Sequence, residues 1–314
     1  MAYRFSHKDD SVQDGMRRIT RQEIAVVVRL IDGPGADVEV TVHELRKACK
    51  KLRALLRLVR PVFSDFDTEN SALRGIARTA SVLRDATTLI GSFDQVAEAY
   101  SAQIDRQALG TVRRRLTLRR NALMADTDAA GILAGCRSDL QALEHRSHDW
   151  ALAADGVEAL QPGLRKAYRR ARNAMRDARQ TPTPTCMHEW RKREKDHWYH
   201  ARLFEPVWKE PMQAHAKAAH ALGDLLGDHH DLTVFLATLT SHPGDFGDTA
   251  KIEVLAGLAT RRQAVLEEEA FAAGERLFAE SPSALAEAWA TRYRAWRNEK
   301  SPHDAALRHA LDAG

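Results

Sequence analysis

Residues 43–63 read HELRKACKKLRALLRLVRPVF, and residues 188–208 read HEWRKREKDHWYHARLFEPVW. A shift of 145 residues aligns the two stretches, and nine of the 21 aligned positions are then identical. The identities include His, Arg and Lys at matching places, which composition alone does not explain. We therefore infer a duplicated helical unit, with the boundary between the halves near residues 158–162.

The first stretch has two distinct faces when it is placed on a helix at 100° per residue. One sector, about 100° wide, holds five cationic or ionisable side chains: His43, Arg46, Lys47, Lys50 and Arg57. The opposite side holds apolar residues: Leu45, Leu52, Leu55, Leu56 and Val59. We expect the apolar side to be buried and the cationic side to bind phosphate groups.

The second stretch repeats the cationic face with the same residue types. The matching positions are His188, Arg191, Lys192, Lys195 and Arg202. Its apolar face is less regular, because Arg193, His197 and His200 stand among Trp190 and Phe204. Like charges on one helix face destabilise the helix, so a doubled cationic face indicates an anionic ligand.

Two further segments are strongly basic. In residues 163–179 the arginines recur at spacings of four and three residues, next to an apolar stripe. They are Arg165, Arg169, Arg172, Arg176 and Arg179, which we call the arginine ladder. In residues 113–120, Arg113 and Arg120 lie nearest the apolar positions. We expect the ladder, Arg113 and Arg120 to line the same channel as the two cationic faces, although the basic residues of 113–120 surround their helix and are also typical of a solvated surface.

The chain is predicted to be all-α. Gly (17) and Pro (10) are sparse, and the apolar residues recur at helical period over long segments. Breaks are expected at Pro34, Pro61, Gly131, Pro162-Gly163, Pro182, Pro206, Pro243 and Pro282, which gives about eight to ten helices. We predict two helical bundles of about four to five helices each, residues 8–157 and 162–298, related by a pseudo-twofold axis, with a tail at 299–314.

Charge and composition restrict the class of partner. The net charge is only +4, but four short segments hold 24 of the 47 Lys and Arg residues, which predicts a strong local positive field. The N-terminus lacks the apolar core of a signal peptide, no apolar run reaches the length of a membrane span, and the three Cys residues form no CxxC pair. These features favour a cytoplasmic protein without a membrane anchor or a zinc site.

No motif predicts catalysis. The segment Gly227-Asp-His-His-Asp231 resembles part of a metal site, but the first copy has Arg84-Asp85 at the same place and supplies no further ligands. The chain has neither a Walker-type phosphate loop nor a nucleophile elbow. We expect no enzymatic activity, no metal and no cofactor.

The pattern His43-x-x-Arg46-Lys47-x-x-Lys50, followed by Arg53 and Arg57 and repeated from His188, resembles the CHAD family, the conserved histidine α-helical domains. Leu83-Arg84-Asp85 and His230-Asp231-Leu232 follow in the family's order, and the likeness covers residues 8–298. It implies two four-helix bundles around a basic central pore that binds inorganic polyphosphate, targeting to polyphosphate granules, where other granule proteins are potential partners, and no catalysis.

Three other functions remain open on the sequence. A basic groove also binds nucleic acid, but sequence-tolerant binders stack bases on aromatic side chains, and only Tyr168 and Tyr199 are candidates on these faces. Peripheral membrane binding is disfavoured, because duplicated helices that face each other would hide their charge. Hydrolysis of phosphoanhydrides would need a cluster of metal-binding carboxylates. The sequence therefore favours polyphosphate binding, with nucleic-acid binding as the alternative.

Overall fold

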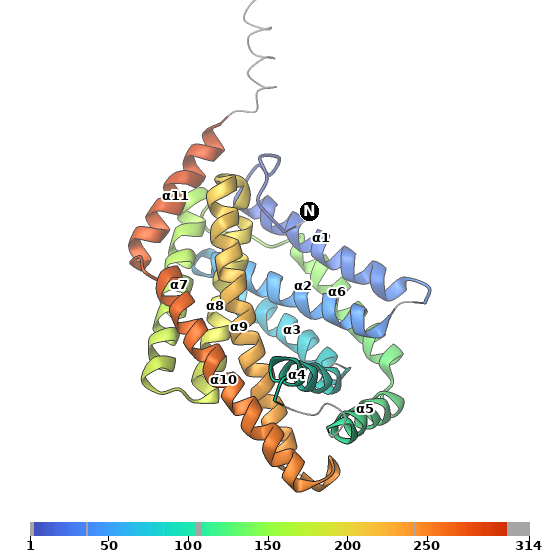
Figure 1. The fold of residues 1–314 in the computed structure, drawn as a ribbon. Coiled ribbons are helices and arrows are strands. Elements are labelled where there is room, and N and C mark those ends of the chain that lie inside the picture. Colours follow the sequence, from blue (N-terminus) through green and yellow to red (C-terminus); the bar gives the residue numbers. More distant parts are fainter. Residues whose placement is uncertain (1–2, 36, 84, 104–108, 242, 300–314) are drawn as a thin grey trace, which may run out of the picture.

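The computed structural model describes residues 3–35, 37–83, 85–103, 109–241 and 243–299 of the 314-residue chain. Over these residues the chain forms eleven α-helices, four 3-10 helices and no strand, which confirms the all-α prediction (Figure 1). The α-helices are α1 (Val12–Asp32), α2 (Val38–Val59), α3 (Phe66–Thr79), α4 (Asp85–Ala99), α5 (Gly110–Ala125), α6 (Ala129–Ser147), α7 (Gly156–Gln180), α8 (Pro184–Leu203), α9 (Lys209–Ser241), α10 (Thr249–Leu277) and α11 (Pro282–Asn298). The 3-10 helices are η1 (Arg60–Val62), η2 (Ala80–Leu83), η3 (Glu205–Val207) and η4 (Pro243–Asp245). Arg84, the side chain of Asp85 and residues 300–314 lie outside the described residues.

Helix starts follow local sequence signals. The side chains of Ser11, Asp37, Thr183 and Ser281 each accept a hydrogen bond from a backbone N–H in the first turn of the helix that follows. Pro184 and Pro282 stand at the first helical position, where no backbone donor is lost. These contacts satisfy donors that a helix start leaves without intrahelical partners.

Two predicted breaks are wrong, because Gly131 lies in the first turn of α6 and Pro162-Gly163 lies inside α7. A Cβ atom at Gly163 would overlap the backbone carbonyl of Leu58 in α2. Glycine is therefore required here by the close approach of two helices, and it does not end α7.

The α2 helix confirms the predicted burial of its apolar side. Leu45, Leu52, Leu55, Leu56 and Val59 are at most 1% exposed, and the small Ala54 is fully buried against α8. Each buried leucine contributes roughly 2 kcal/mol, whereas each like-charge pair on the helix costs only a few tenths of a kcal/mol. Apolar burial therefore outweighs repulsion along the cationic face.

The apolar residues form two clusters. The larger one draws on α1, α2, α3, α6, α7, α8 and α11 with parts of α9 and α10. The smaller one contains Leu89, Val112, Phe235 and Leu255, from α4, α5, the C-terminal part of α9 and the first half of α10. Helices from the first and second halves of the sequence thus share this second core.

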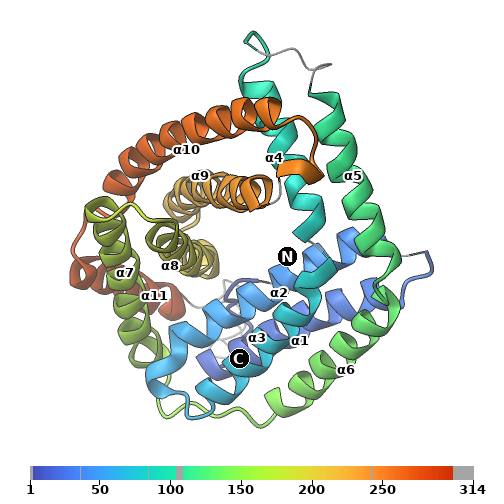
Figure 2. The ribbon, with the colours of Figure 1, turned by 90° about the horizontal axis from the view of Figure 1, so that it is seen from below.

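In the view of Figure 2, four helices lie innermost: α2, α4, α8 and α9. Helix α7 lies outside α8.

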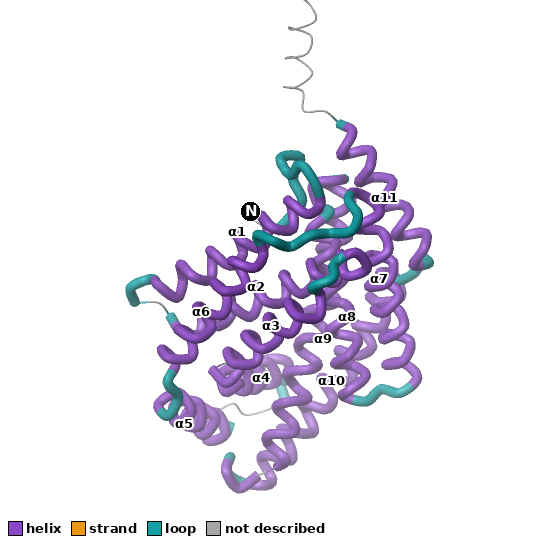
Figure 3. The backbone as a smooth tube through the Cα atoms, turned by 180° about the vertical axis from the view of Figure 1, so that it is seen from behind, coloured by secondary structure: helices purple, strands orange, loops and turns teal. Residues whose placement is uncertain are grey.

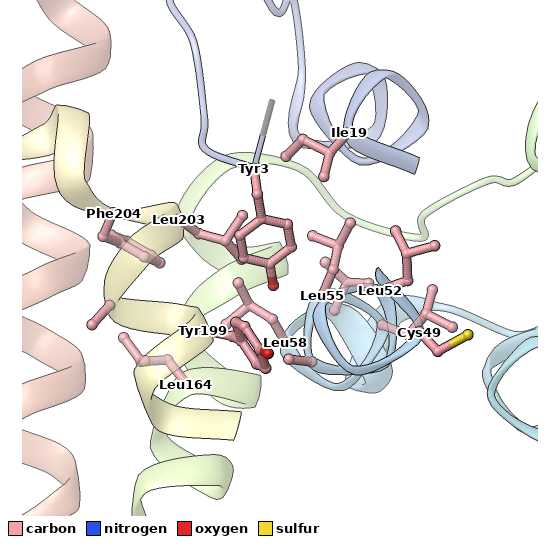
Figure 4. Packing of buried hydrophobic residues seen from close by; sticks show 14 of the residues in the cluster. Tyr3, Ile19, Cys49, Leu52, Leu55, Leu58, Leu164, Tyr199, Leu203 and Phe204 are labelled. Carbon is pink, nitrogen blue, oxygen red and sulfur yellow. The ribbon is translucent and has the colours of Figure 1, made fainter. Parts of the chain in front are cut away.

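Most connections between the helices are short, as the tube of Figure 3 shows. The N-terminal segment lies over α2 and the C-terminal end of α8: the Tyr3 hydroxyl donates to the carbonyl of Lys51, and the Phe5 amide donates to the carbonyl of Leu203. Figure 4 shows Tyr3 packed between Leu203 of α8 and the apolar side of α2. Among the described residues, no helix is both long enough and apolar enough to cross a membrane.

Candidate functional site

A cavity of about 540 Å³ lies between the cationic faces of α2 and α8. Helix α2 contributes four of its lining residues: Arg46, Lys50, Arg53 and Arg57. Helix α8 contributes seven: His188, Arg191, Lys192, Arg193, Lys195, Asp196 and Tyr199. Arg74 of α3, Thr88 of α4 and three α9 residues, His230, Asp231 and Val234, complete the wall. We call this space the basic cavity.

The lining carries nine Lys and Arg side chains and two Asp side chains, a formal excess of seven positive charges. Like charges in a partly buried space repel one another more strongly than on an open surface. Burial, followed by the neighbouring guanidinium of Arg57, lowers the pKa of Arg53 to about 10. An anion in the cavity would reduce the repulsion among these cations and would raise the pKa of Arg53 again. The cavity is therefore suited to anion binding.

Asp196 of α8 is the main acidic contact inside the wall. Its carboxylate is 7% exposed and accepts from Arg57 of α2 at 2.7 Å and from Arg193 at 3.2 Å. Nearby, the carbonyl of Ala54 lies 2.8 Å from Nε2 of buried His200. These contacts fix the position at which α2 and α8 cross and direct two guanidinium groups along the cavity wall.

The two copies share an ion pair within the helix. Lys47 contacts Glu44 at 2.9 Å in α2, and Lys192 contacts Glu189 at 2.5 Å in α8, at positions 145 residues apart. Lys192 lines the basic cavity, whereas Lys47 does not. Both lysines are more than one third exposed, so each pair contributes little to stability.

Gly223 of α9 allows Lys195 of α8 to lie against that helix. A Cβ at Gly223 would come within 2.6 Å of Nζ of Lys195, whereas one at Gly227 would make only an ordinary van der Waals contact, at 3.8 Å, with the guanidinium of Arg191. Glu194 is fully buried beside them, and its carboxylate oxygens have no hydrogen-bond partner among the described residues. Burial raises the pKa of Glu194 to about 8, against the effect of Lys195 and Arg191. The raised pKa favours the protonated carboxyl, which subtracts less from the positive charge near the cavity than an ordinary glutamate does.

Two histidines stack at the α9 wall. The rings of His188 and His230 have centroids 4.3 Å apart, and Nδ1 of His188 is buried without a hydrogen-bond partner in the described part of the chain. Burial, and then Lys192 and Arg191, lower the pKa of His188. Burial, and then His188 and Arg191, lower the pKa of His230 to about 4. The lowered pKa values favour the neutral form of both rings in the ligand-free protein.

His43 lies in a neighbouring cavity of about 440 Å³, together with Glu39, Asp228 and Asp231. The two cavities share Thr88 and Asp231, so they adjoin. The first histidine of the repeated pattern therefore lines a more acidic space than the second, although both belong to one connected region.

The remaining predicted phosphate-binding residues lie outside the lining of the basic cavity. Arg202 lies over the rings of Trp198 and Tyr3, at 5.6 Å and 6.0 Å from the ring centroids. On α5, Arg113 contacts Asp94 at 2.7 Å, and Arg120 lies 3.9 Å from Glu39. The arginine ladder is on α7, where its members are exposed except for the half-buried Arg172. The structure thus brings together the two cationic faces but not these other segments.

Eight of the sixteen lining residues were not predicted to bind phosphate, and they include Arg74, Arg193, Tyr199 and His230. Arg193 was assigned to the apolar side of its helix, and its partner Asp196 explains why it can lie at the edge of that side. The match of His230 to Arg84 in the repeat was a usable signal. Arg74 shares α3 only with Arg78 and belongs to no repeated pattern, so nothing in the sequence marks it.

Two alternative roles lose support. Tyr168 is fully buried and donates its hydroxyl to the carbonyl of Leu277, so it cannot stack on a bound base. In the 227–231 segment, His229 bonds to Glu267 at 2.7 Å and His230 stacks on His188. No group of three or more His, Cys, Asp or Glu suited to a metal ion occurs within the described ranges.

Comparisons with known proteins agree with the all-helical fold. A family model described as the CHAD domain matches residues 17–240. The fold is similar to that of a crystal structure of the CHAD domain from the plant Ricinus communis, with a TM-score of 0.61 and 18% sequence identity, over 88% of this chain and 95% of that chain. Among curated proteins, none matches the sequence.

Proposed function

The chain belongs to the CHAD domain family, and from this premise we propose that it binds inorganic polyphosphate in the basic cavity, without catalysing a reaction. The family is associated with polyphosphate binding in general. The proposal includes a cytoplasmic location at polyphosphate granules, where other granule proteins are potential partners.

One observation carries the proposal: nine Lys and Arg side chains from three helices line a single cavity of about 540 Å³. Eight of them come from α2 and α8, the helices that contain the two copies of the repeated stretch. A linear polyanion can contact both helices at once, and each additional charge-assisted contact strengthens binding.

We further propose that the basic cavity is the central pore of the family, between two helical bundles related by a pseudo-twofold axis. The equivalent ion pairs Glu44–Lys47 and Glu189–Lys192 support this relation, as do the matching pairs Arg46/Arg191 and Lys50/Lys195, which line one cavity from two helices. The two bundles are not fully separate, because the apolar core of α4, α5, α9 and α10 joins helices from both halves of the sequence.

Polyphosphate is preferred over nucleic acid because the cavity offers few surfaces for base stacking. Tyr199 is the one Phe, Tyr or Trp residue in the lining as described, and it is 3% exposed, while the rings of His188 and His230 lie against each other. Sequence-tolerant nucleic-acid binders gain about 1–3 kcal/mol per stacked base, which this wall does not provide. A polyanion without bases loses nothing by binding here.

Binding without hydrolysis is favoured by the state of the acidic groups. Asp196 is engaged by two arginines, and His229 is bonded to Glu267. Both carboxylates are thus engaged by side chains of the protein, whereas metal-assisted phosphoanhydride hydrolysis requires carboxylates that bind the metal.

The test is a parallel titration with long-chain polyphosphate, single-stranded DNA and duplex DNA at equal concentrations of negative charge. We expect polyphosphate to bind most tightly, with an affinity that falls linearly with salt on a log–log plot and a slope of at least ~4 ions. Equal affinity for all three polyanions, or an affinity independent of salt, would contradict the proposal.

A further inference from the structure

Helix α7 carries a second basic surface on its outer side. Its apolar stripe, which includes Leu164, Tyr168 and Ala171, is buried toward α8, α11 and α2. The rest of the helix surface between Ala159 and Arg176 carries six Lys or Arg residues and no acid. We call this the outer surface of α7: Arg165, Lys166, Arg169, Arg170, Arg172 and Arg176.

Most of these cations lack a partner. Arg165, Lys166, Arg169, Arg170 and Arg172 make no hydrogen bond or ion pair with any residue that the structure describes. The first acid of the helix beyond them, Asp177, lies 3.7 Å from Arg176. The ladder then ends at Arg179, which is paired with Glu275 at 2.8 Å. The uncompensated part is the stretch from 165 to 172.

The basic run on α5 provides a contrast within the same molecule. There Arg113 pairs with Asp94, and Arg115 donates to the carbonyls of Gly244 and Asp245. Arg119 lies 5.9 Å from the centroid of Phe246, and Arg120 approaches Glu39. The α5 arginines hold neighbouring segments together, whereas those of α7 between 165 and 172 have no such role.

The outer surface of α7 is separate from the basic cavity. None of its residues lines that cavity, and α8 lies between α7 and α9 in Figure 2. Arg170 comes nearest, since burial and then Arg193 lower its pKa. Arg170 therefore lies close to the cavity residues Arg193 and Asp196, whereas a ligand that fills the cavity leaves the charges of Arg165, Arg169 and Arg172 uncompensated.

The geometry of the surface matches an extended chain of charges. Arg165, Arg169, Arg172 and Arg176 lie on one face and are spread over roughly 16 Å of helix at 1.5 Å per residue. Repulsion among four guanidinium groups at this spacing costs free energy that an anion would recover. Guanidinium groups also bind phosphate oxygens in a bidentate manner.

We propose that the outer surface of α7 is a second polyanion-contact surface, which takes another segment of linear polyphosphate while the basic cavity holds the first. The inference rests on the proposed function of the cavity. It makes the protein bivalent, so one molecule joins two chains, or two segments of one long chain, and condenses polyphosphate.

The first experiment uses titration calorimetry to measure how many molecules of a short polyphosphate bind to each protein molecule. The polyphosphate is chosen so short that it cannot reach both surfaces. The wild-type protein at low salt is expected to bind two equivalents, the tighter in the cavity. The triple variant Arg165→Gln, Arg169→Gln and Arg172→Gln is expected to bind one equivalent, in the cavity, with the affinity that the tighter site has in the wild-type protein. The cavity variant Arg46→Gln with Lys50→Gln should retain only the weaker site.

A matched control removes the same charge elsewhere. Arg114, Arg276 and Arg294 are exposed, lie on three different helices and make no ion pair in the described ranges. Their triple replacement by Gln should keep two equivalents. With long-chain polyphosphate, light scattering should show particles for wild type and control near charge equivalence, and at least tenfold less scattering for the α7 variant.

The possible failures are distinguishable. A single equivalent in wild type, lost in the cavity variant and kept in the α7 variant, would overturn the bivalent inference and leave the cavity proposal standing. A single equivalent lost only in the α7 variant would overturn the proposed function of the cavity. If the α7-dependent site prefers single-stranded DNA at equal charge, its ligand is nucleic acid and the inference is wrong.

Discussion

Helices α2 and α8 contain the two copies of one sequence stretch, and they differ mainly on the side that faces away from the basic cavity. The positions of Leu52 and Leu55 in α2 are taken by His197 and His200 in α8, and all four residues are at most 1% exposed. On the cavity side, Arg46 and Lys50 correspond to Arg191 and Lys195. The copies thus share their cationic side chains more closely than their packing.

The difference shows that α8 has a second task besides lining the cavity. His197 lies 2.8 Å from His215 of α9, nitrogen to nitrogen, and packs among Tyr168, Phe278 and Trp289. Lys51 of α2 pairs with Glu23 of α1, while its counterpart Asp196 pairs with Arg57 across the helix crossing. Helix α8 thus makes buried polar contacts with its neighbours where α2 makes mainly apolar ones.

The largest expected effect comes from removing matched charges from each wall. We expect Arg46→Gln with Lys50→Gln, and separately Arg191→Gln with Lys195→Gln, to weaken polyphosphate binding about 100-fold, because each pair loses two charge-assisted contacts of about 1.5 kcal/mol. Titration at fixed low salt measures the loss, and circular dichroism checks the fold. If only one pair matters, a single wall holds the ligand.

The next effect concerns stability in acid. Burial and then His215 lower the pKa of His197, and burial lowers that of His215 to about 4. The unfolded chain therefore binds more protons at these two histidines below pH 6.5, and their contribution to the free energy of unfolding should fall by about 2 kcal/mol between pH 7 and pH 4.5. Glu194, whose pKa is raised by burial, contributes in the opposite direction over the same range, so the histidine contribution is the difference between wild type and a variant without the two histidines. Denaturant titrations at several pH values measure this fall.

The comparison with α2 supplies the control for that prediction. Replacing His197 by the Leu of its α2 counterpart, together with His215→Leu, removes both partners of the hydrogen bond and should flatten the pH dependence at little cost at pH 7. A double variant that remains as acid-sensitive as wild type would show that other groups cause the loss.

A smaller effect is expected in the pH dependence of binding. Bound phosphate should raise the lowered pKa values of His188 and His230, which face Arg191, Lys192 and Glu189 of α8 and His229 of α9. Binding then takes up protons, so affinity should rise about fivefold from pH 8 to pH 6.

The two histidine positions of the repeat can be separated by mutation. His188→Gln with His230→Gln should abolish most of the pH response, whereas His43→Gln, in the adjoining cavity, should retain it. The opposite result would identify His43 as the ligand-linked histidine.

The smallest effect tests the acid that α8 has in place of Lys51. Asp196→Asn keeps an acceptor for Arg57 and removes one negative charge from the wall, so polyphosphate should bind about threefold more tightly, equivalent to about 0.7 kcal/mol. Lys51→Gln should leave affinity unchanged, because Lys51 contacts Glu23 and does not line the cavity. Weaker binding of Asp196→Asn would mean that the carboxylate is needed to position Arg57 and Arg193.

The sequence by itself determined the all-helical fold and the cationic faces of α2 and α8. Both follow from periodicity along a single helix: buried leucines on one side of α2 require that Arg46 and Lys50 lie on the other. The family also followed from the sequence, because the repeated pattern contains residue types and spacings that composition alone does not produce.

Only the tertiary structure decided which basic segments meet. Periodicity places a side chain on a face of its own helix but does not state what that face packs against, so the α7 ladder and α5 were expected in the channel and lie elsewhere. Arg202 turned toward Trp198 and Tyr3 because the N-terminal segment packs at that end of α8. Gly163 lies within α7 because the backbone of α2 passes against it, a contact between residues about 100 positions apart that no local pattern records.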